Sequence, residues 1–295
     1  MEISILLAEQ ILAMFLTMAV GFGVVRAGLF KTEDSRIISN MVVYICNPCV
    51  VVHSFQIELT DDKIKGLMIA IGLSVVVHMV LIIGSEILSF IFHFNSIEKA
   101  SIIYTNAGYL VIPLVGAVLG EEWVFYTTAF ILVQTVLMWT HGVKLIGQEK
   151  ELNIRKILCN PNVIAMIIGI ALFALEIRLP TVVDSCVSGF GDMISPASMM
   201  VIGMVIGDVD LKWVFRQKRP YLICLLRLIV FPLIAVVAFA GLERSGIHPD
   251  AEYILMIVLI ATSAPAAAMI TQLAQIYGKD SRYASVINVM SVIFC

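Results

Sequence analysis

An asparagine, a glycine and a proline lie close together in the stretch NAGYLVIPLVG, as Asn106, Gly108 and Pro113. Most flanking residues are apolar, so this amide side chain is predicted to lie away from bulk water. An interior proline removes a backbone hydrogen bond and costs an ordinary helix about 3 kcal/mol or more. A helix broken between Gly108 and Pro113 exposes amide donors that, together with Asn106, suit a carboxylate. The alternative role for Asn106 is an interhelical hydrogen bond, worth about 0.6–2 kcal/mol.

A second stretch, ATSAPAAAMITQ, combines a proline with polar side chains in the same way. Pro265 is predicted to interrupt the helix, and the three alanines after it would let another helix approach closely. Small residues are also ordinary packing devices in membranes. Ser263 and Gln272 add polar atoms around the break, and we expect them to bind substrate or line its pathway.

Two charged residues in apolar surroundings are further candidates, because ionisable groups inside a membrane are usually functional. Asp192 lies four residues before Pro196 and is a candidate for coupling transport to an ion. Arg227 lies inside an apolar segment and is a candidate for compensating the charge of an anion. Its alternatives are a structural ion pair or a side chain that snorkels toward the interface.

The cysteines do not indicate a metal site. Cys46 and Cys49 form a CxxC, but this pair lies deep in an apolar segment and no second Cys or His cluster completes a zinc site. Buried free cysteine is the usual state of such residues. We therefore expect no metal and no cofactor.

The composition predicts that lipid surrounds most of this chain. Of its 295 residues, 60% are hydrophobic and only 14% are charged, whereas soluble domains are near 45–50% apolar and about a quarter charged. A bilayer core needs roughly 20 helical residues per crossing, so the chain has room for about ten spans.

Charged and turn-forming clusters divide the chain into ten apolar segments. The tenth has only 13 residues up to Cys295, too short to span a membrane. Either the chain ends inside its last helix, which we favour, or the number of segments is not ten. The expected segments are 3–25, 37–57, 66–92, 100–120, 123–146, 160–177, 181–207, 220–242, 251–277 and 283 onward.

Basic residues predict the orientation of these segments. The connections after odd-numbered segments, counted together with Lys144 at the end of the fifth segment, carry 14 of the 19 Lys and Arg residues. The positive-inside rule therefore places these connections in the cytoplasm and the N-terminus outside. The longest polar connection, Gln148 to Lys156, divides the chain into two halves of five segments each, 1–150 and 151–295.

The two halves have matching prolines. Pro48 and Pro113 are 65 residues apart, and Pro196 and Pro265 are 69 residues apart, in the second and fourth segments of each half. Two similar halves with five spans each must insert in opposite orientations, as in many secondary transporters. Paired interruptions are the best pointer from sequence to a binding site at the membrane midplane.

Several short motifs are similar to those of the auxin efflux carrier family, which includes plant PIN auxin carriers and bacterial carriers of malate- or malonate-like acids. They begin with NxGxxxxPL at Asn106 and continue with NPNVIAMIIGIAL, RLIVFPL, SAPAAA and YGKD. The resemblance implies ten helices in two inverted five-helix repeats, with broken fourth and ninth helices crossing at the substrate site. It also implies a homodimer and a scaffold formed by the first, second, sixth and seventh helices.

The resemblance assigns Asn106 to the substrate carboxylate, because plant members have an asparagine at the matching position of their fourth helix. Their second crossover asparagine has no counterpart here, since Ser263 and Ala264 precede Pro265. This sequence therefore differs from the plant members at one of the two residues that are expected to contact the substrate.

We expect a secondary carrier of small organic anions, chiefly carboxylates, in the plasma or inner cell membrane, coupled to protons or sodium or to neither. The alternative is a receptor that keeps the carrier fold and binds a ligand without flux. The sequence lacks HExxH, GxSxG and GxxxxGK[ST] motifs, so neither an enzyme nor an ATP-driven pump is expected. It also has no basic stripe for nucleic acid.

Overall fold

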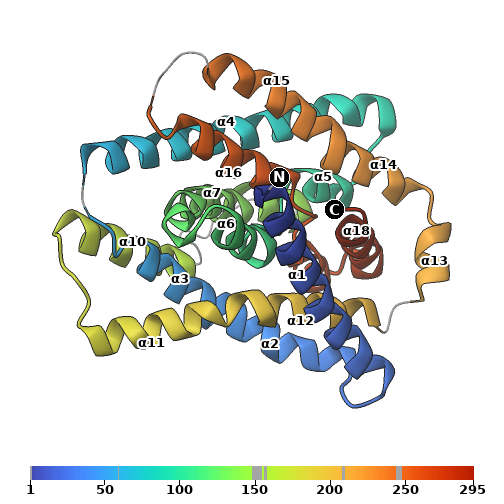
Figure 1. The fold of residues 1–295 in the computed structure, drawn as a ribbon. Helices are drawn as coiled ribbons and strands as arrows, with labels where there is room; N and C mark the ends of the chain where they lie inside the picture. The colour runs from blue at the N-terminus through green and yellow to red at the C-terminus, as the bar shows by residue number, and fades with distance from the viewer. Residues whose placement is uncertain (1, 59, 148–154, 156–157, 208–209, 244–247) are drawn as a thin grey trace. The chain divides into compact units, whose positions relative to one another are not determined.

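The computed structural model describes residues 2–58, 60–147, 155, 158–207, 210–243 and 248–295 (Figure 1). Nearly all of these residues are helical, and no β-strand occurs among them. The prediction of an all-α protein is therefore confirmed.

Five helical stretches in the described part of the chain are long and apolar enough to cross a membrane. Three shorter apolar helices accompany them, at Leu12–Arg26, Pro161–Ala174 and Ala251–Ser263. The five long stretches are Thr32–Ser54, Asp61–Phe92, Glu121–Gly147, Thr181–Gly207 and Arg219–Phe239. A set of several long apolar helices is typical of a multi-pass membrane protein.

The chain forms two compact units, and each combines segments from both halves of the sequence. The first contains the four segments expected for a scaffold, together with Gly108–Thr128. The first unit is Met1–Asp61, Gly108–Thr128 and Cys159–Asp210; the second is Asp62–Ala107, Ala129–Leu158 and Leu211–Cys295.

The first unit is organised around the contact between α1 and α12, which cross in the view of Figure 1. Glycines permit this contact: a Cβ atom on Gly203 would collide with the backbone of Met18, and one on Gly21 with the backbone of Met200. The helices of this unit are α1 (Glu2–Arg26), η1 (Thr32–Asp34), α2 (Ser35–Met41), η2 (Val42–Cys46), α3 (Asn47–Ser54), α6 (Ile112–Val118), η4 (Glu121–Trp123), α10 (Pro161–Ala174), α11 (Thr181–Asp192) and α12 (Ile194–Gly207).

The second unit contains α4 (Asp61–Phe92), whose 32 residues extend about 48 Å at 1.5 Å per residue. An ionic contact joins two of its shorter helices: Glu98 is fully buried and pairs with Arg219, whose side chain is half exposed. The other helices are α5 (Ser96–Ile103), most of α7 (Val124–Leu137), η5 (Met138–Gly142), α8 (Val143–Gly147), α13 (Leu211–Arg216), α14 (Arg219–Leu225), η6 (Leu226–Val230), α15 (Phe231–Glu243), α16 (Ala251–Ser263), α17 (Met269–Ile276) and α18 (Ser281–Phe294).

Three prolines each lie two residues after a π-helical turn. Pro48 follows η2, Pro113 follows η3 (Ala107–Val111), and Pro232 follows η6. A proline has no N–H for the carbonyl four residues earlier and its ring clashes with that carbonyl, so the helix widens locally rather than ending. The helix is continuous through Pro48, where we expected an interruption. Near Pro196 the interruption is a single residue, Met193, between α11 and α12.

The break in the fourth segment lies nearer the N-terminus than predicted. We expected it between Gly108 and Pro113, but α5 ends at Ile103 and the non-helical residues are Tyr104 to Asn106. Tyr104 is extended, with φ −98° and ψ 131°. The π-helical turn absorbs the proline, so Pro113 does not itself break the helix.

Candidate functional site

Two interrupted segments meet in the second unit. Residues after α5 and after α16 form an antiparallel bridge between Thr105 and Ala266. The Asn106 N–H donates to the Pro265 carbonyl at 2.8 Å, and the Ala267 N–H donates to the Tyr104 carbonyl at 3.0 Å. Each break therefore satisfies backbone groups of the other. We call residues 104–106 and 264–267 the crossover.

Gln134 of α7 binds the first segment of the crossover, residues 104–106, through both polar atoms of its side-chain amide. Its Oε1 accepts from the Thr105 N–H at 2.8 Å and from Thr105 Oγ1 at 2.9 Å. Its Nε2 donates to the Thr105 carbonyl at 2.8 Å. Thr105 is almost fully buried, so these bonds replace the water that its backbone has lost.

Two residues of α18 bind the second segment of the crossover, residues 264–267. Ser291 Oγ accepts from the Ala266 N–H at 3.0 Å, and Asn288 Nδ2 donates to the Ala266 carbonyl at 2.7 Å. Both central residues of the bridge thus have their N–H and their carbonyl paired, by side chains on different helices.

Arg227 joins the two helix ends that precede the crossover. Its Nη1 donates to the Ile102 carbonyl at 2.5 Å, and its Nε donates to the Ala264 carbonyl at 3.1 Å. The side chain is fully buried, and Nη2 has no hydrogen-bond partner among the described residues. The alternative that Arg227 snorkels toward the interface does not hold, because its guanidinium is fully buried inside the unit and donates to two backbone carbonyls.

The structure brings four predicted site residues together at the crossover or beside it: Asn106, Pro265, Arg227 and Ser263. Asn106 and Pro265 are buried. Ser263 Oγ donates to the Leu259 carbonyl of its own helix at 2.8 Å, so its hydroxyl proton is already engaged. Gln272 lies on α17, and its side chain is outside the part that the structure describes.

Gly108 belongs to the first unit and lies against Asn47. A Cβ atom at Gly108 would come within 2.7 Å of Asn47 Nδ2, so a larger residue would displace this amide. Asn47 is buried, and its Oδ1 has no partner among the described residues. The sequence singled out Gly108 as a helix-weakening residue, whereas its role here is to permit a close approach.

Pro113 and Asp192 line one cavity of the first unit, with a volume of about 250 Å³. His53 and Glu121 line it as well, and His53 Nδ1 lies 2.9 Å from Asp184 Oδ1. Carboxylates repel a bound anion and attract protons or cations. The surroundings of Asp192 therefore suit a coupling role better than substrate binding.

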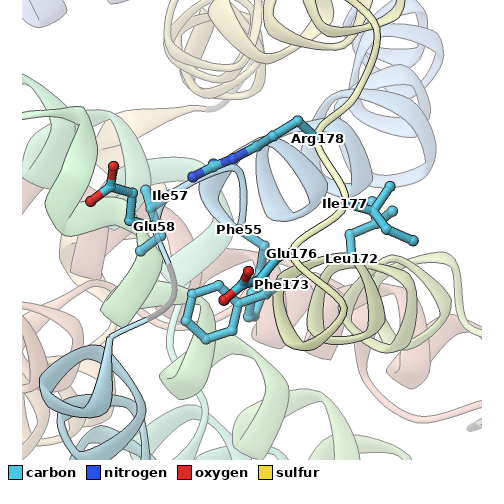
Figure 2. Close-up of a pocket in the computed structure, with 8 residues that line it drawn as sticks. All are labelled: Phe55, Ile57, Glu58, Leu172, Phe173, Glu176, Ile177 and Arg178. Carbon is cyan, nitrogen blue, oxygen red and sulfur yellow. The ribbon is translucent and has the colours of Figure 1, made fainter.

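A larger cavity of the first unit, about 330 Å³, lies where α3 and α10 end. Its lining includes the buried rings of Phe55 and Phe173 and the charged residues Glu58, Glu176 and Arg178. Figure 2 shows the guanidinium end of Arg178 extending toward the side that carries Glu58. No predicted site residue lines this cavity, and no motif in the sequence indicates it.

Sequence reasoning missed Gln134, Asn288 and Ser291. Each is a polar residue within an apolar segment, and this property alone could have marked them, because polar groups inside a membrane usually have a specific partner. Their partners could not be inferred, since those partners are backbone atoms of residues distant in the sequence.

Comparison with known proteins agrees with the membrane-embedded fold. One family model, described as membrane transport protein, matches residues 6–153 and residues 149–295. No curated protein matches the chain. The two matches together span nearly its whole length.

Proposed function

The chain belongs to the auxin efflux carrier family of membrane transport proteins, and we propose that it is a secondary carrier of small organic anions, chiefly carboxylates. Members of this family are transporters, not enzymes. The observation that carries the proposal is the pairing of two helix breaks at Thr105 and Ala266. Non-helical backbone at membrane depth is tolerated only beside protein or a water-filled cavity, and secondary transporters bind substrate there.

The proposed topology has ten transmembrane helices in two inverted repeats, residues 1–150 and 151–295. The N-terminus is outside the cell, and the protein is a homodimer in the plasma or inner membrane. The distribution of Lys and Arg supports the orientation. The breaks support the repeats, because they fall in the fourth expected segment of each half.

The proposed substrate site is built on Asn106. This residue directly precedes η3, and the first N–H groups of a helix carry a positive partial charge. An amide donor beside such a helix end suits a carboxylate oxygen. Pro265 contributes the opposite side of the site, and Ser263 joins it when its hydroxyl releases the Leu259 carbonyl. Gln272 is kept as a candidate on its sequence position alone, whereas Gly108 and Pro113 shape the segment that follows Asn106.

Charge compensation comes from Arg227, whose Nη2 is a buried donor without a partner among the described residues. A fixed positive charge at the crossover lowers the cost of bringing an anion out of water. Asp192 is the proposed coupling residue, because its cavity holds a second carboxylate and an imidazole. Alternating access exposes the substrate site first to one side of the membrane and then to the other.

The function is tested with purified protein and a panel of small mono- and dicarboxylates. Thermal unfolding at two pH values, with and without sodium, identifies the acids that stabilise the protein. Uptake of those acids into liposomes is then measured. Saturable uptake that requires the protein is the expected result. Stabilisation without uptake would favour a receptor, and neither effect with any acid would refute the proposal.

A further inference from the structure

Two backbone carbonyls beside the crossover are held by a charged donor. The Arg227 guanidinium donates to the carbonyls of Ile102 and Ala264. The carbonyls of four other crossover residues are held by neutral peptide N–H groups or amide side chains, namely those of Tyr104, Thr105, Pro265 and Ala266. The charged donor is thus confined to the two positions where a helix ends.

These two carbonyls lie at the negative ends of two helices. Ile102 is the penultimate residue of α5, and Ala264 is the C-cap of α16. The last carbonyls of a helix lack intrahelical partners, and each helix end carries a partial charge of about −0.5. Two such ends together offset part of the positive charge of the guanidinium, and its Nη2, which has no partner among the described residues, remains available to an anion.

No acidic side chain among the described residues forms an ion pair with Arg227. It is fully buried, and the ion pairs found there join His53 to Asp184, Lys99 to Glu86 and Arg219 to Glu98. A buried charge without compensation is strongly unfavourable. The two helix ends therefore supply the compensation that an acidic residue supplies elsewhere.

Half-helix C-terminal ends and unwound carbonyls are also where secondary transporters coordinate coupling sodium ions. A guanidinium that already donates to these carbonyls occupies one lone pair of each, and its positive charge repels a metal cation. We propose that Arg227 is the resident cation of the crossover: it holds the two half-helices together and takes the place of a coupling metal cation. The consequence of this role for transport rests on the proposed function, whereas the role of Arg227 in holding the two half-helices together does not.

The first test measures the thermal stability of the purified full-length protein. Arg227→Ala removes the guanidinium and leaves space for a free guanidinium ion of the same shape. We expect the variant to unfold at a Tm lower by roughly 5 °C or more. Millimolar guanidinium chloride, compared with sodium chloride at equal ionic strength, should recover part of this loss. The unmodified protein and the exposed-residue variant Arg216→Ala should show no such recovery.

If Arg227→Ala does not fold, a second pair of variants tests whether the positive charge at this position stabilises the protein. Arg227→Lys keeps the positive charge, whereas Arg227→Met removes it with a side chain of similar length. The lysine variant should have the higher Tm. A methionine variant as stable as the lysine variant, or an equal response to guanidinium in all proteins, would overturn the proposal.

The consequence for transport is measured in liposomes with an acid that the unmodified protein carries. Uptake should be unchanged when choline replaces sodium on both sides of the membrane. Uptake that stops without sodium would show that a metal cation is still required. If no acid is carried, the proposed function fails, and the stability measurements still decide the role of Arg227.

Discussion

The backbone N–H of Asn106 donates a 2.8 Å hydrogen bond to the carbonyl of Pro265, although the two residues lie in opposite halves of the sequence. The bond fixes the position of the Asn106 Cα atom relative to the second break. The position of the amide side chain therefore depends on both segments of the crossover. The four predictions below concern the crossover and the helix contacts inside each unit.

Asn106→Ala tests the contact between substrate and amide. A hydrogen bond to a charged group contributes about 1.5–3 kcal/mol, so its loss should raise the KM for uptake by roughly 10- to 100-fold. Because the backbone bond to Pro265 remains, Tm should change little. Asn40→Ala, at an exposed position of α2, is the matched control and should behave like the unmodified protein. Unchanged uptake kinetics in Asn106→Ala would show that this side chain does not bind the carried acid.

Gln134→Leu tests whether the amide side chain holds the crossover. The substitution leaves the buried N–H and carbonyl of Thr105 without partners, at a cost of about 1–3 kcal/mol each. We expect a lower Tm, measured by tryptophan fluorescence during heating. Gln134→Glu retains the acceptor and should lose less. Gln217→Leu, outside the crossover, is the control, and a leucine variant at position 134 that unfolds with the control would contradict this role.

The pair of Glu98 and Arg219 predicts a rescue by double mutation. Glu98 is fully buried, and it also accepts from Tyr283 Oη at 2.7 Å and from the Asn95 N–H at 2.9 Å. Arg219→Met removes the cation from this carboxylate, which costs about 1.5–3 kcal/mol because Arg219 is half exposed and the other two donors remain. Glu98→Gln removes that charge and keeps an oxygen acceptor.

The double variant Glu98→Gln/Arg219→Met should therefore be more stable than Arg219→Met alone. Chemical denaturation of all four proteins in one detergent gives the coupling free energy. If the effects of the two substitutions simply added, the buried charge would not be the cause of the instability.

Gly203→Ala tests the close contact between α1 and α12. A Cβ atom at this position collides with the backbone of Met18, which cannot move without displacing the helix. Overpacking of this kind costs about 1–3 kcal/mol. Gly23→Ala on α1 meets no atom within 4 Å and should be neutral or stabilising by about 0.5–1 kcal/mol. Equal Tm values for the two variants would show that the helices tolerate a wider separation.

The membrane class, the helical fold and the existence of both breaks could be predicted from the sequence, because each depends on local properties. Hydrophobic runs report the surrounding solvent, and proline removes a backbone donor wherever it occurs. The position of a break was less predictable. A π-helical turn before Pro113 moved the non-helical residues to 104–106, and this turn depends on the packing around it.

The sequence by itself determined that Asn106, Pro265 and Arg227 are unusual in an apolar chain. Only the tertiary structure decided what they do, because their partners are backbone atoms, which every residue has and no motif marks. Arg227 illustrates the difference: its charge was visible from the start, but its counter-charge is formed by the ends of two helices. The two helix ends act as one counter-charge only when both helices have folded and their C-terminal ends lie beside the guanidinium.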